Sequence, residues 1–288
     1  MTEHRFLVDS VERGCELMDL PRSTYYYRSK SKPEAEQELL ERIEAVIEEF
    51  PGYGYRRVTR ELHRQGFRDN HKKVLRIMKK HGLTKKLRRR WVCTTNSNHA
   101  HRIYPNLMPN LLVTGPNQLW VADLTYISIL SGFVYLAIVL DLFARRLVGY
   151  ALSQRIDTAL CLEALRMALA QRKPPAGIIH HSDRGVQYAS GDYVEVLHQH
   201  GFRISMARKG NPYDNAAAES FIKTLKSEEV YLWEYRTLND VQNRLPYFLE
   251  EVYNHKRLHS SIGYVPPVEF EELFYQTQSC PLTLTASV

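Results

Sequence analysis

Near residue 118 the sequence changes from helical periodicity to strand-forming runs, and this change constrains the fold more than any other feature. From there, three runs rich in β-branched and aromatic residues follow one another with gaps of only a few residues. Gaps of that length join antiparallel strands, because a parallel pair needs a crossover connection of a dozen or more residues. The sequence therefore predicts a three-stranded antiparallel meander with the strands QLWVADLTYISI, FVYLAIVLDL and RRLVGYALS.

Helices and strands alternate after this meander. The segment DTALCLEALRMALAQR predicts a helix that Asp157 caps, and a short strand, IIHH, follows it. A helix near 191–200, the strand RISM and a helix from about Asp214 complete the series. Three strands followed by alternating helices and strands predict an α/β domain with a mixed sheet, in the element order of a ribonuclease-H-like core.

The part of the chain before residue 95 shows helical periodicity instead. Apolar residues recur at helical spacing over 33–50, which predicts an amphipathic helix. Two shorter helices are predicted at about 56–65 and 70–81, the second of them capped by Asp69 or Asn70. Two short helices joined by a Gly-containing turn are typical of a helix-turn-helix domain.

Positive charge is concentrated in the same region. Residues 52–90 hold 15 Lys and Arg against two acids, an excess of +13 in a chain whose net charge is +7. A focused basic block is typical of a module that binds a polyanion, although an exposed lysine-rich helix is the alternative. In a helix-turn-helix the second helix enters the major groove. We therefore expect that helix to contact DNA through Lys72, Lys73 and Arg76.

Three acids are candidates for a shared site. Asp123 lies inside the first predicted strand between apolar residues, where a lone charge is costly unless it is paired or bound to metal. Asp183 directly follows the fourth strand, and Glu219 lies in the last predicted helix. Each one taken alone also fits a surface position, a cap or an ion pair. Turns and helix caps account for other acids of this region: Asp141, Asp157 and Asp214.

The helix around Glu219 carries two bases on the side of this acid. At 100° per residue, Lys223 lies about 40° and Lys226 about 20° from Glu219 around the helix axis. Lysines one and two turns from a metal ligand would hold a DNA phosphate, so we expect both to bind DNA. The alternative is a surface Glu–Lys pair, worth only a few tenths of a kcal/mol.

The composition of this acidic set predicts the cofactor. Three carboxylates without cysteine suit a hard cation, and Mg²⁺ is expected, with Mn²⁺ able to substitute. Two such ions about 4 Å apart support phosphoryl transfer with little further help from the protein. Asp123, Asp183 and Glu219 are thus the predicted metal ligands and catalytic residues, and His180 and His181 are predicted to end a strand beside them.

At this point the motifs resemble a known family. The chain resembles bacterial insertion-sequence transposases of the IS-three group, OrfB type, in their three catalytic blocks. The matching segments are WVADLTYI with Asp123, HHSDRGVQYAS with Asp183, and GNPYDNAAAESFIKTLKSE with Glu219. These belong to the DDE superfamily, which includes retroviral integrases. Thirty-five residues separate Asp183 from Glu219, as in the family. YNHKRLHSSIGYVPPVEF resembles the closing block, and we expect its Arg257 and His259 to bind DNA.

This resemblance implies a transposase that cleaves element ends and joins them to target DNA. It implies a ribonuclease-H-like core, Mg²⁺ dependence and a homo-multimer on duplex DNA. It further implies an OrfA product, fused to OrfB by frameshifting, as partner. Lys226 falls where the family keeps a basic residue for DNA. Two alternatives stay open: a non-catalytic DNA-binding regulator of transposition, and a ribonuclease-H-type nuclease of unrelated role.

These features together predict the domain organisation. We expect a short helix-turn-helix-like fragment over residues 1–32 and a basic helix-turn-helix domain over 33–95. A linker over 96–115 then leads to an integrase-type catalytic core over 116–270 and a tail over 271–288. No apolar run approaches the roughly 20 residues that span a bilayer, and the charged N-terminus disfavours a secretion signal. The expected location is the bacterial cytoplasm, in association with the nucleoid.

Overall fold

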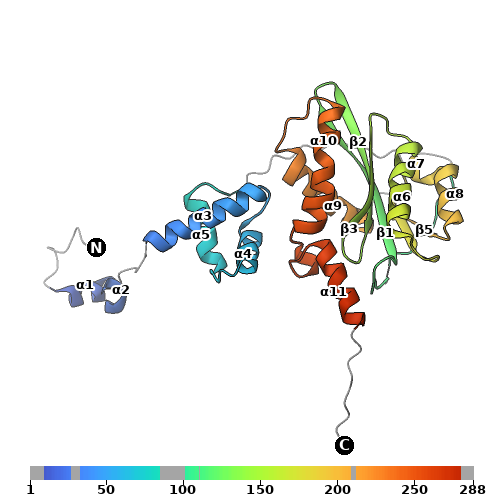
Figure 1. Ribbon diagram of the computed structural model, residues 1–288. Helices are drawn as coiled ribbons and strands as arrows, with labels where there is room; N and C mark the ends of the chain where they lie inside the picture. The colour runs from blue at the N-terminus through green and yellow to red at the C-terminus, as the bar shows by residue number, and fades with distance from the viewer. Residues whose placement is uncertain (1–9, 27–32, 85–100, 110, 209–211, 280–288) are drawn as a thin grey trace, which may run out of the picture.

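The computed structural model describes residues 10–26, 33–84, 101–109, 111–208 and 212–279. Their centre is a five-stranded sheet in the order β3-β2-β1-β4-β5, with helices on both faces (Figure 1). The strands are β1 (Leu119–Ile129), β2 (Gly132–Asp141), β3 (Arg146–Ser153), β4 (Ile179–Ser182) and β5 (Arg203–Met206). No helix in these residues is long and apolar enough to cross a bilayer.

The strand pairing confirms the predicted meander and the mixed sheet. β1 pairs with β2 and β2 with β3 in antiparallel register, whereas β4 lies parallel to both β1 and β5. The parallel strands are reached through the helices α6 (Thr158–Arg172), α7 (Val186–Ala189) and α8 (Gly191–Gln199). Such crossovers place helices against the sheet, so β1 has apolar residues on both of its faces.

Two hydrophobic layers cover the sheet. On one face, Trp120 and Ala122 of β1 pack in a cluster with residues of α6 and α8. On the other face, Val121 and Ile127 pack with α9 (Ala216–Leu225), α10 (Leu238–Tyr247) and the π-helix η4 (Phe248–Lys256). Figure 1 shows α9 and α10 on the side of the sheet opposite to α6 and α7.

Glycine permits the close packing of α6 on the sheet. A Cβ atom at Gly149 of β3 would lie 2.2 Å from the carbonyl oxygen of Ala164 in α6. Asp157 caps this helix as predicted, because its carboxylate accepts a hydrogen bond from the Leu160 backbone N–H at 3.0 Å. The local sequence therefore specifies both where α6 begins and how closely it approaches β3.

The N-terminal region is helical. α3 (Pro33–Glu49), α4 (Tyr55–Arg64) and α5 (His71–Lys80) share one buried cluster, after two short helices, α1 (Val11–Leu17) and α2 (Arg22–Tyr26). Asn70 caps α5, accepting from the Lys72 N–H at 2.8 Å. These bounds confirm the predicted helix pair. The end of the predicted helix-turn-helix domain, from residue 85, and part of the predicted linker fall outside the described residues.

The helical domain packs on the C-terminal part of the core. Leu258, which follows η4, is buried in the cluster of α3, α4 and α5. The Tyr53 hydroxyl accepts a hydrogen bond from the Leu258 N–H at 2.8 Å, and Arg64 of α4 pairs with Glu269 at 2.7 Å. The helical domain and the core therefore share an interface.

Two details of the prediction were wrong. The core does not end at residue 270, since the helix α11 (Pro267–Ser279) runs through that boundary and its Glu271 is 2% exposed, paired with Arg146 and Arg172.

Asp214 does not cap α9. Its carboxylate instead accepts hydrogen bonds from the backbone and guanidinium of Arg208, and a short 3₁₀ helix, η2 (Pro212–Asn215), precedes α9.

Candidate active site

The parallel pairing of β1 and β4 brings two of the three candidate acids to one end of the sheet. Trp120 lies opposite His180, and Val121 lies opposite His181. Asp123 and Asp183 each stand two residues beyond this last pair, Asp123 still in β1 and Asp183 just after β4. Because parallel strands advance together, these two carboxylates become neighbours.

The turn after β4 holds Asp183 through its backbone. The Asp183 Oδ1 atom accepts a hydrogen bond from the Gly185 N–H at 2.8 Å. A Cβ atom at position 185 would lie 2.9 Å from that same oxygen, so glycine leaves room for the carboxylate. The HHSDRG segment is therefore a strand end and a tight turn that present one carboxylate.

The third acid comes from α9, whose first turn is fastened to β1. The Asn215 side chain donates a hydrogen bond to the carbonyl oxygen of Ala122 at 3.3 Å, one residue before Asp123. Glu219 lies one helical turn further along and is exposed. This anchor places the start of α9 over the end of the sheet where Asp123 lies.

These side chains influence the protonation of one another. Burial, and after it the negative charge of Asp183, raises the pKa of Asp123 to about 8, and Glu219 contributes in the same direction. Burial also raises the pKa of Glu219. Carboxylates that crowd together in this way repel one another unless protons or cations neutralise them.

The three acids do not lie close enough together to bind one metal ion in this structure. No three His, Cys, Asp or Glu side chains in the described part of the chain lie close enough to hold one metal ion. Asp123 and Asp183 are neighbours, whereas Glu219 points from the exposed side of α9. The structure thus brings the predicted residues to one end of the sheet without their converging on a single point.

Lys226 lies beside this acidic group. Its Nζ atom is 4.2 Å from the centre of the Tyr126 ring, on β1. Burial lowers the pKa of Lys226, and the charge of Asp123 opposes that shift. Lys226 is the first residue of the π-helix η3 (Lys226–Val230), which follows α9. Lys223 is exposed on α9. Lys226 thus lies near Asp123, and the position of Lys223 beside the acids stays a prediction.

His180 and His181 are structural residues of β4. His180 is buried and bonds the Tyr193 hydroxyl at 2.9 Å, while His181 bonds the Ser205 hydroxyl at 2.8 Å. Burial lowers the pKa of His180 to about 3 and that of His181 to about 4, so both are neutral. Their prediction as strand-end residues is confirmed.

Arg257 and His259 do not lie where an exposed DNA contact would. Arg257 is 3% exposed, and its guanidinium donates to both oxygens of Glu228, at 2.7 and 2.8 Å. His259 is also buried, and burial together with the positive charge of Arg257 lowers its pKa to about 2. Their burial is the opposite of what a surface contact requires.

Sequence reasoning missed the ion network that Glu228 forms. Arg57 of α4 pairs with Glu228 at 3.1 Å, so this acid joins the helical domain to Arg257 of the core. A Cβ atom at Gly52 would lie 2.1 Å from the Glu228 Cγ atom, so the network requires glycine there. No local sequence pattern marks this network, because Glu228 lies 29 residues from Arg257 and 171 residues from Arg57.

The predicted DNA-contacting residues of α5 differ in their partners. Lys73 pairs with Asp69 at 2.9 Å, and Arg76 pairs with Glu36 at 2.9 Å. Lys72 is exposed and forms no ion pair within the described residues. Of these three predicted contacts, Lys72 is therefore the one whose charge no acid of the described residues shares.

Comparisons with known proteins agree with this architecture. Residues 34–91 match the family model HTH-like domain, and residues 113–212 and 200–267 match two models named Integrase core domain. The chain is 39% identical over 249 residues to the transposase for insertion sequence element IS904 of Lactococcus lactis, covering 85% of this chain and 98% of that protein. It is 33% identical over 270 residues to the transposase InsF for insertion sequence IS3A of Escherichia coli, covering 91% and 94%.

A relative and a solved structure complete the comparison. An uncharacterized 31 kDa protein of insertion element IS600 from Shigella sonnei is 38% identical over 268 residues, covering 91% of this chain and 98% of that protein. The catalytic core domain of HTLV-2 integrase, solved in complex with magnesium, is 14% identical with a TM-score of 0.42, covering 55% of this chain and 97% of that one.

Proposed function

The chain belongs to the insertion-sequence transposases of the IS3 family, which are DDE-type polynucleotidyl transferases, and from that premise we propose that Asp123, Asp183 and Glu219 are its catalytic metal ligands. The observation that carries this proposal is the pairing of β1 with β4, which sets Asp123 beside Asp183. The anchored first turn of α9 supplies the third acid at the same end of the sheet.

The donor set fits a hard divalent cation. All three side chains offer carboxylate oxygens, the ligands that Mg²⁺ and Mn²⁺ prefer. Burial, and after it repulsion from Asp183, raises the pKa of Asp123, and a bound cation would relieve this repulsion. We propose Mg²⁺ as the ion, two ions as the number, and closure of Glu219 onto the other two acids as a consequence of binding.

The chain's own residues hold and orient the DNA in this scheme. Bound divalent ions supply activation of the attacking oxygen and neutralise charge on the leaving oxygen. Asp183, held by the Gly185 N–H, and Asp123, fixed in β1, keep the carboxylates in place before DNA arrives. In this proposal Lys226, which lies near Asp123, and Lys223, which is exposed on α9, hold a phosphate of the strand by charge.

A strand-transfer assay tests this function. Purified protein with Mg²⁺ and DNA that carries the element ends is expected to join those ends to a second DNA molecule. A non-catalytic regulator of transposition would bind the ends without cutting them. A ribonuclease-H-type nuclease would hydrolyse DNA without joining it, so the products distinguish all three functions.

Lys226 is expected to hold DNA without taking part in the chemistry. Lys226→Ala should weaken DNA binding and lower the slope of log K against log salt by about one contact. Cleavage should fall and then recover partly when DNA is in excess. Glu219→Gln should do the reverse, with normal binding and no recovery, which salt titrations and cleavage assays of the two variants would measure. Normal DNA binding by Lys226→Ala would make Lys226 an ordinary surface lysine.

The helix-turn-helix domain offers a matched pair of lysines. Lys72→Ala is expected to lower the salt slope of duplex binding by about one, because Lys72 carries an unshared charge. Lys73→Ala should lower it less, since Asp69 already neutralises Lys73 at 2.9 Å. Both variants would be measured by salt titration in the full chain, because Leu258 of the core completes the helical domain's hydrophobic cluster. Equal decreases in the salt slope for the two variants would contradict a groove contact made by Lys72 and not by Lys73.

Partners and location follow from the family. We propose that the protein acts on the element ends and target as a homo-multimer, together with an OrfA product or as an OrfA–OrfB fusion. We also propose that it works in the bacterial cytoplasm on the nucleoid. Co-purification of a tagged protein with DNA and with the product of the upstream reading frame would test both.

A further inference from the structure

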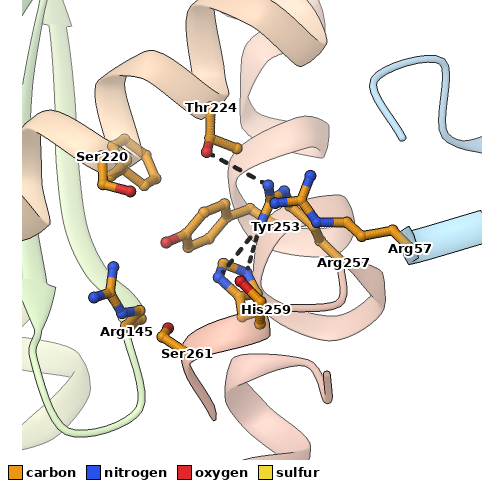
Figure 2. A pocket seen from close by; sticks show the side chains of 10 residues that line it. Arg57, Arg145, Ser220, Thr224, Tyr253, Arg257, His259 and Ser261 are labelled. Carbon is orange, nitrogen blue, oxygen red and sulfur yellow. Dashed lines mark hydrogen bonds between the residues drawn. The ribbon is translucent and has the colours of Figure 1, made fainter. Parts of the chain in front are cut away.

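A polar pocket lies where the helical domain meets the core, beside α9. Its lining comes from four parts of the chain, namely α4, the turn between β2 and β3, α9, and the segment from η4 to the 3₁₀ helix η5 (Ser260–Ile262). The pocket has a volume of about 270 Å³. Figure 2 shows the side chains of Arg57, Arg145 and Arg257 around it, with Ser220 and Thr224 on the α9 side.

The charge of this pocket is positive. Arg57 and Arg257 share one acid, Glu228, which lies outside the lining. Arg145 forms no ion pair within the residues that the structure describes. His259 adds no charge because its pKa is lowered to about 2, chiefly by burial. The buried Arg257 directs its guanidinium at Glu228, so Arg145 supplies the unpaired positive charge of the lining, and the second arginine on Glu228, Arg57, leaves a further net positive charge beside it.

Arg145 occupies a backbone position that arginine seldom adopts. Its φ of 56° lies in the left-handed region, which favours glycine or asparagine. A turn with glycine here would avoid that strain but would lose the guanidinium. Arg145 is also half-buried, and Figure 2 shows its side chain directed toward the pocket from the side opposite Thr224. A strained residue whose charge is unpaired is a candidate for ligand binding.

Hydroxyl groups complete a set of donors. Ser220 and Thr224 stand four residues apart on α9, so both face the pocket from one side of the helix. Ser260 and Ser261 are exposed at its mouth. The lining residues include no carboxylate. Guanidinium and hydroxyl donors around a small cavity suit a tetrahedral oxyanion such as phosphate, which arginine binds through paired N–H groups.

The position of the pocket identifies the source of this phosphate. Ser220 directly follows Glu219, about 100° around the same helix, so the pocket and the acidic group flank one another on α9. Arg57 brings the DNA-binding domain to its other side. We infer that the pocket binds a backbone phosphate of the DNA, a few nucleotides from the bond that is cut. This inference rests on the proposed function.

Three variants of the full chain test the inference. Arg145→Gln and Arg145→Gly both remove the positive charge of this side chain. Glycine also suits the left-handed backbone at this position, so a loss of DNA binding by Arg145→Gly is not explained by a folding defect. Arg155→Gln, at an exposed arginine after β3, is the matched control. Both Arg145 variants are expected to bind a short duplex about tenfold more weakly, as for one lost charge-assisted contact, with a salt slope lower by about one. Arg155→Gln should bind as the wild type does.

A second measurement separates DNA from free phosphate. Inorganic phosphate alone should raise the thermal midpoint of the wild type slightly, and not that of Arg145→Gly. If phosphate stabilises the wild type but the Arg145 variants bind duplex normally, the pocket takes free phosphate and the inference is overturned. Unchanged duplex binding without any phosphate effect would overturn it as well.

The same experiments separate this inference from the proposed function. A wild type that cuts and joins DNA, with Arg145 variants that bind and cut equally well, would overturn the pocket inference alone. A wild type that binds duplex with an Arg145-dependent slope but never cuts it would support the pocket and overturn the catalytic proposal.

Discussion

Asp123→Asn, Asp183→Asn and Glu219→Gln are each expected to abolish Mg²⁺-dependent cleavage and strand transfer. Metal ions stabilise the charge of a phosphoryl-transfer transition state by several kcal/mol. A loss of about 4 kcal/mol corresponds to a rate about a thousandfold lower. Cleavage of radiolabelled DNA under single-turnover conditions would measure the effect. Near-normal cleavage by any one variant would remove that residue from the ligand set.

The folded state provides the control for these variants. Burial and Asp183 raise the folded-state pKa of Asp123 to about 8, above its unfolded value, so a charged Asp123 opposes folding at neutral pH without metal. Asparagine is neutral and of similar shape. Asp123→Asn should therefore be at least as stable as the wild type in metal-free buffer, and should lose the stabilisation that Mg²⁺ gives the wild type. Thermal unfolding with and without Mg²⁺ measures both effects.

Arg257→Met is expected to lower the free energy of unfolding by about 3 kcal/mol, the lower end of the range for breaking a buried ion pair. The substitution keeps much of the side-chain volume but leaves the Glu228 carboxylate without the Arg257 guanidinium that binds both of its oxygens. Arg57 remains near Glu228 at 3.1 Å and limits the loss. Urea unfolding of the full chain would measure the change.

Two further variants test that interpretation. Arg236→Met removes an exposed arginine, 3.8 Å from Glu234, and should cost less than about 1 kcal/mol. Glu228→Gln combined with Arg257→Met should cost less than the sum of the two single changes, because the partners are in contact. If Arg257→Met were as stable as the wild type, Arg257 would not be a structural residue, and the prediction that it contacts DNA would stand again.

Local patterns in the sequence were sufficient for much of the site. The apolar residues around Asp123 predict a strand, and the strand followed by Asp183 and glycine predicts a turn at its end. Both predictions depend on residues within a few positions, as do the helix caps at Asn70 and Asp157, which the structure confirms. The helical periodicity likewise predicted Lys226 beside the acids; in the structure Lys226 lies near Asp123, at the start of the π-helix η3.

The order of strands and helices suggested the three acids as one site, and the resemblance to a family supported that grouping. No spacing along the chain states that β4 pairs with β1 and not with another strand. The register that sets Asp123 beside Asp183 arises from the packing of both sheet faces, which local propensity does not encode.

Tertiary structure alone decided the roles of the long polar side chains. The resemblance of the closing block predicted Arg257 as a DNA contact, yet the side chain is buried, because Glu228, 29 residues away, pairs with it and with Arg57 of the helical domain. Asp214 has the sequence of a helix cap but binds Arg208, and Glu271 was assigned to a tail but pairs with Arg146 and Arg172. The sequence by itself thus determined the strands, helices and caps, because these depend on near neighbours. Which charges are buried together was decided by the folded chain, because an ion pair forms only where distant segments meet and exclude water.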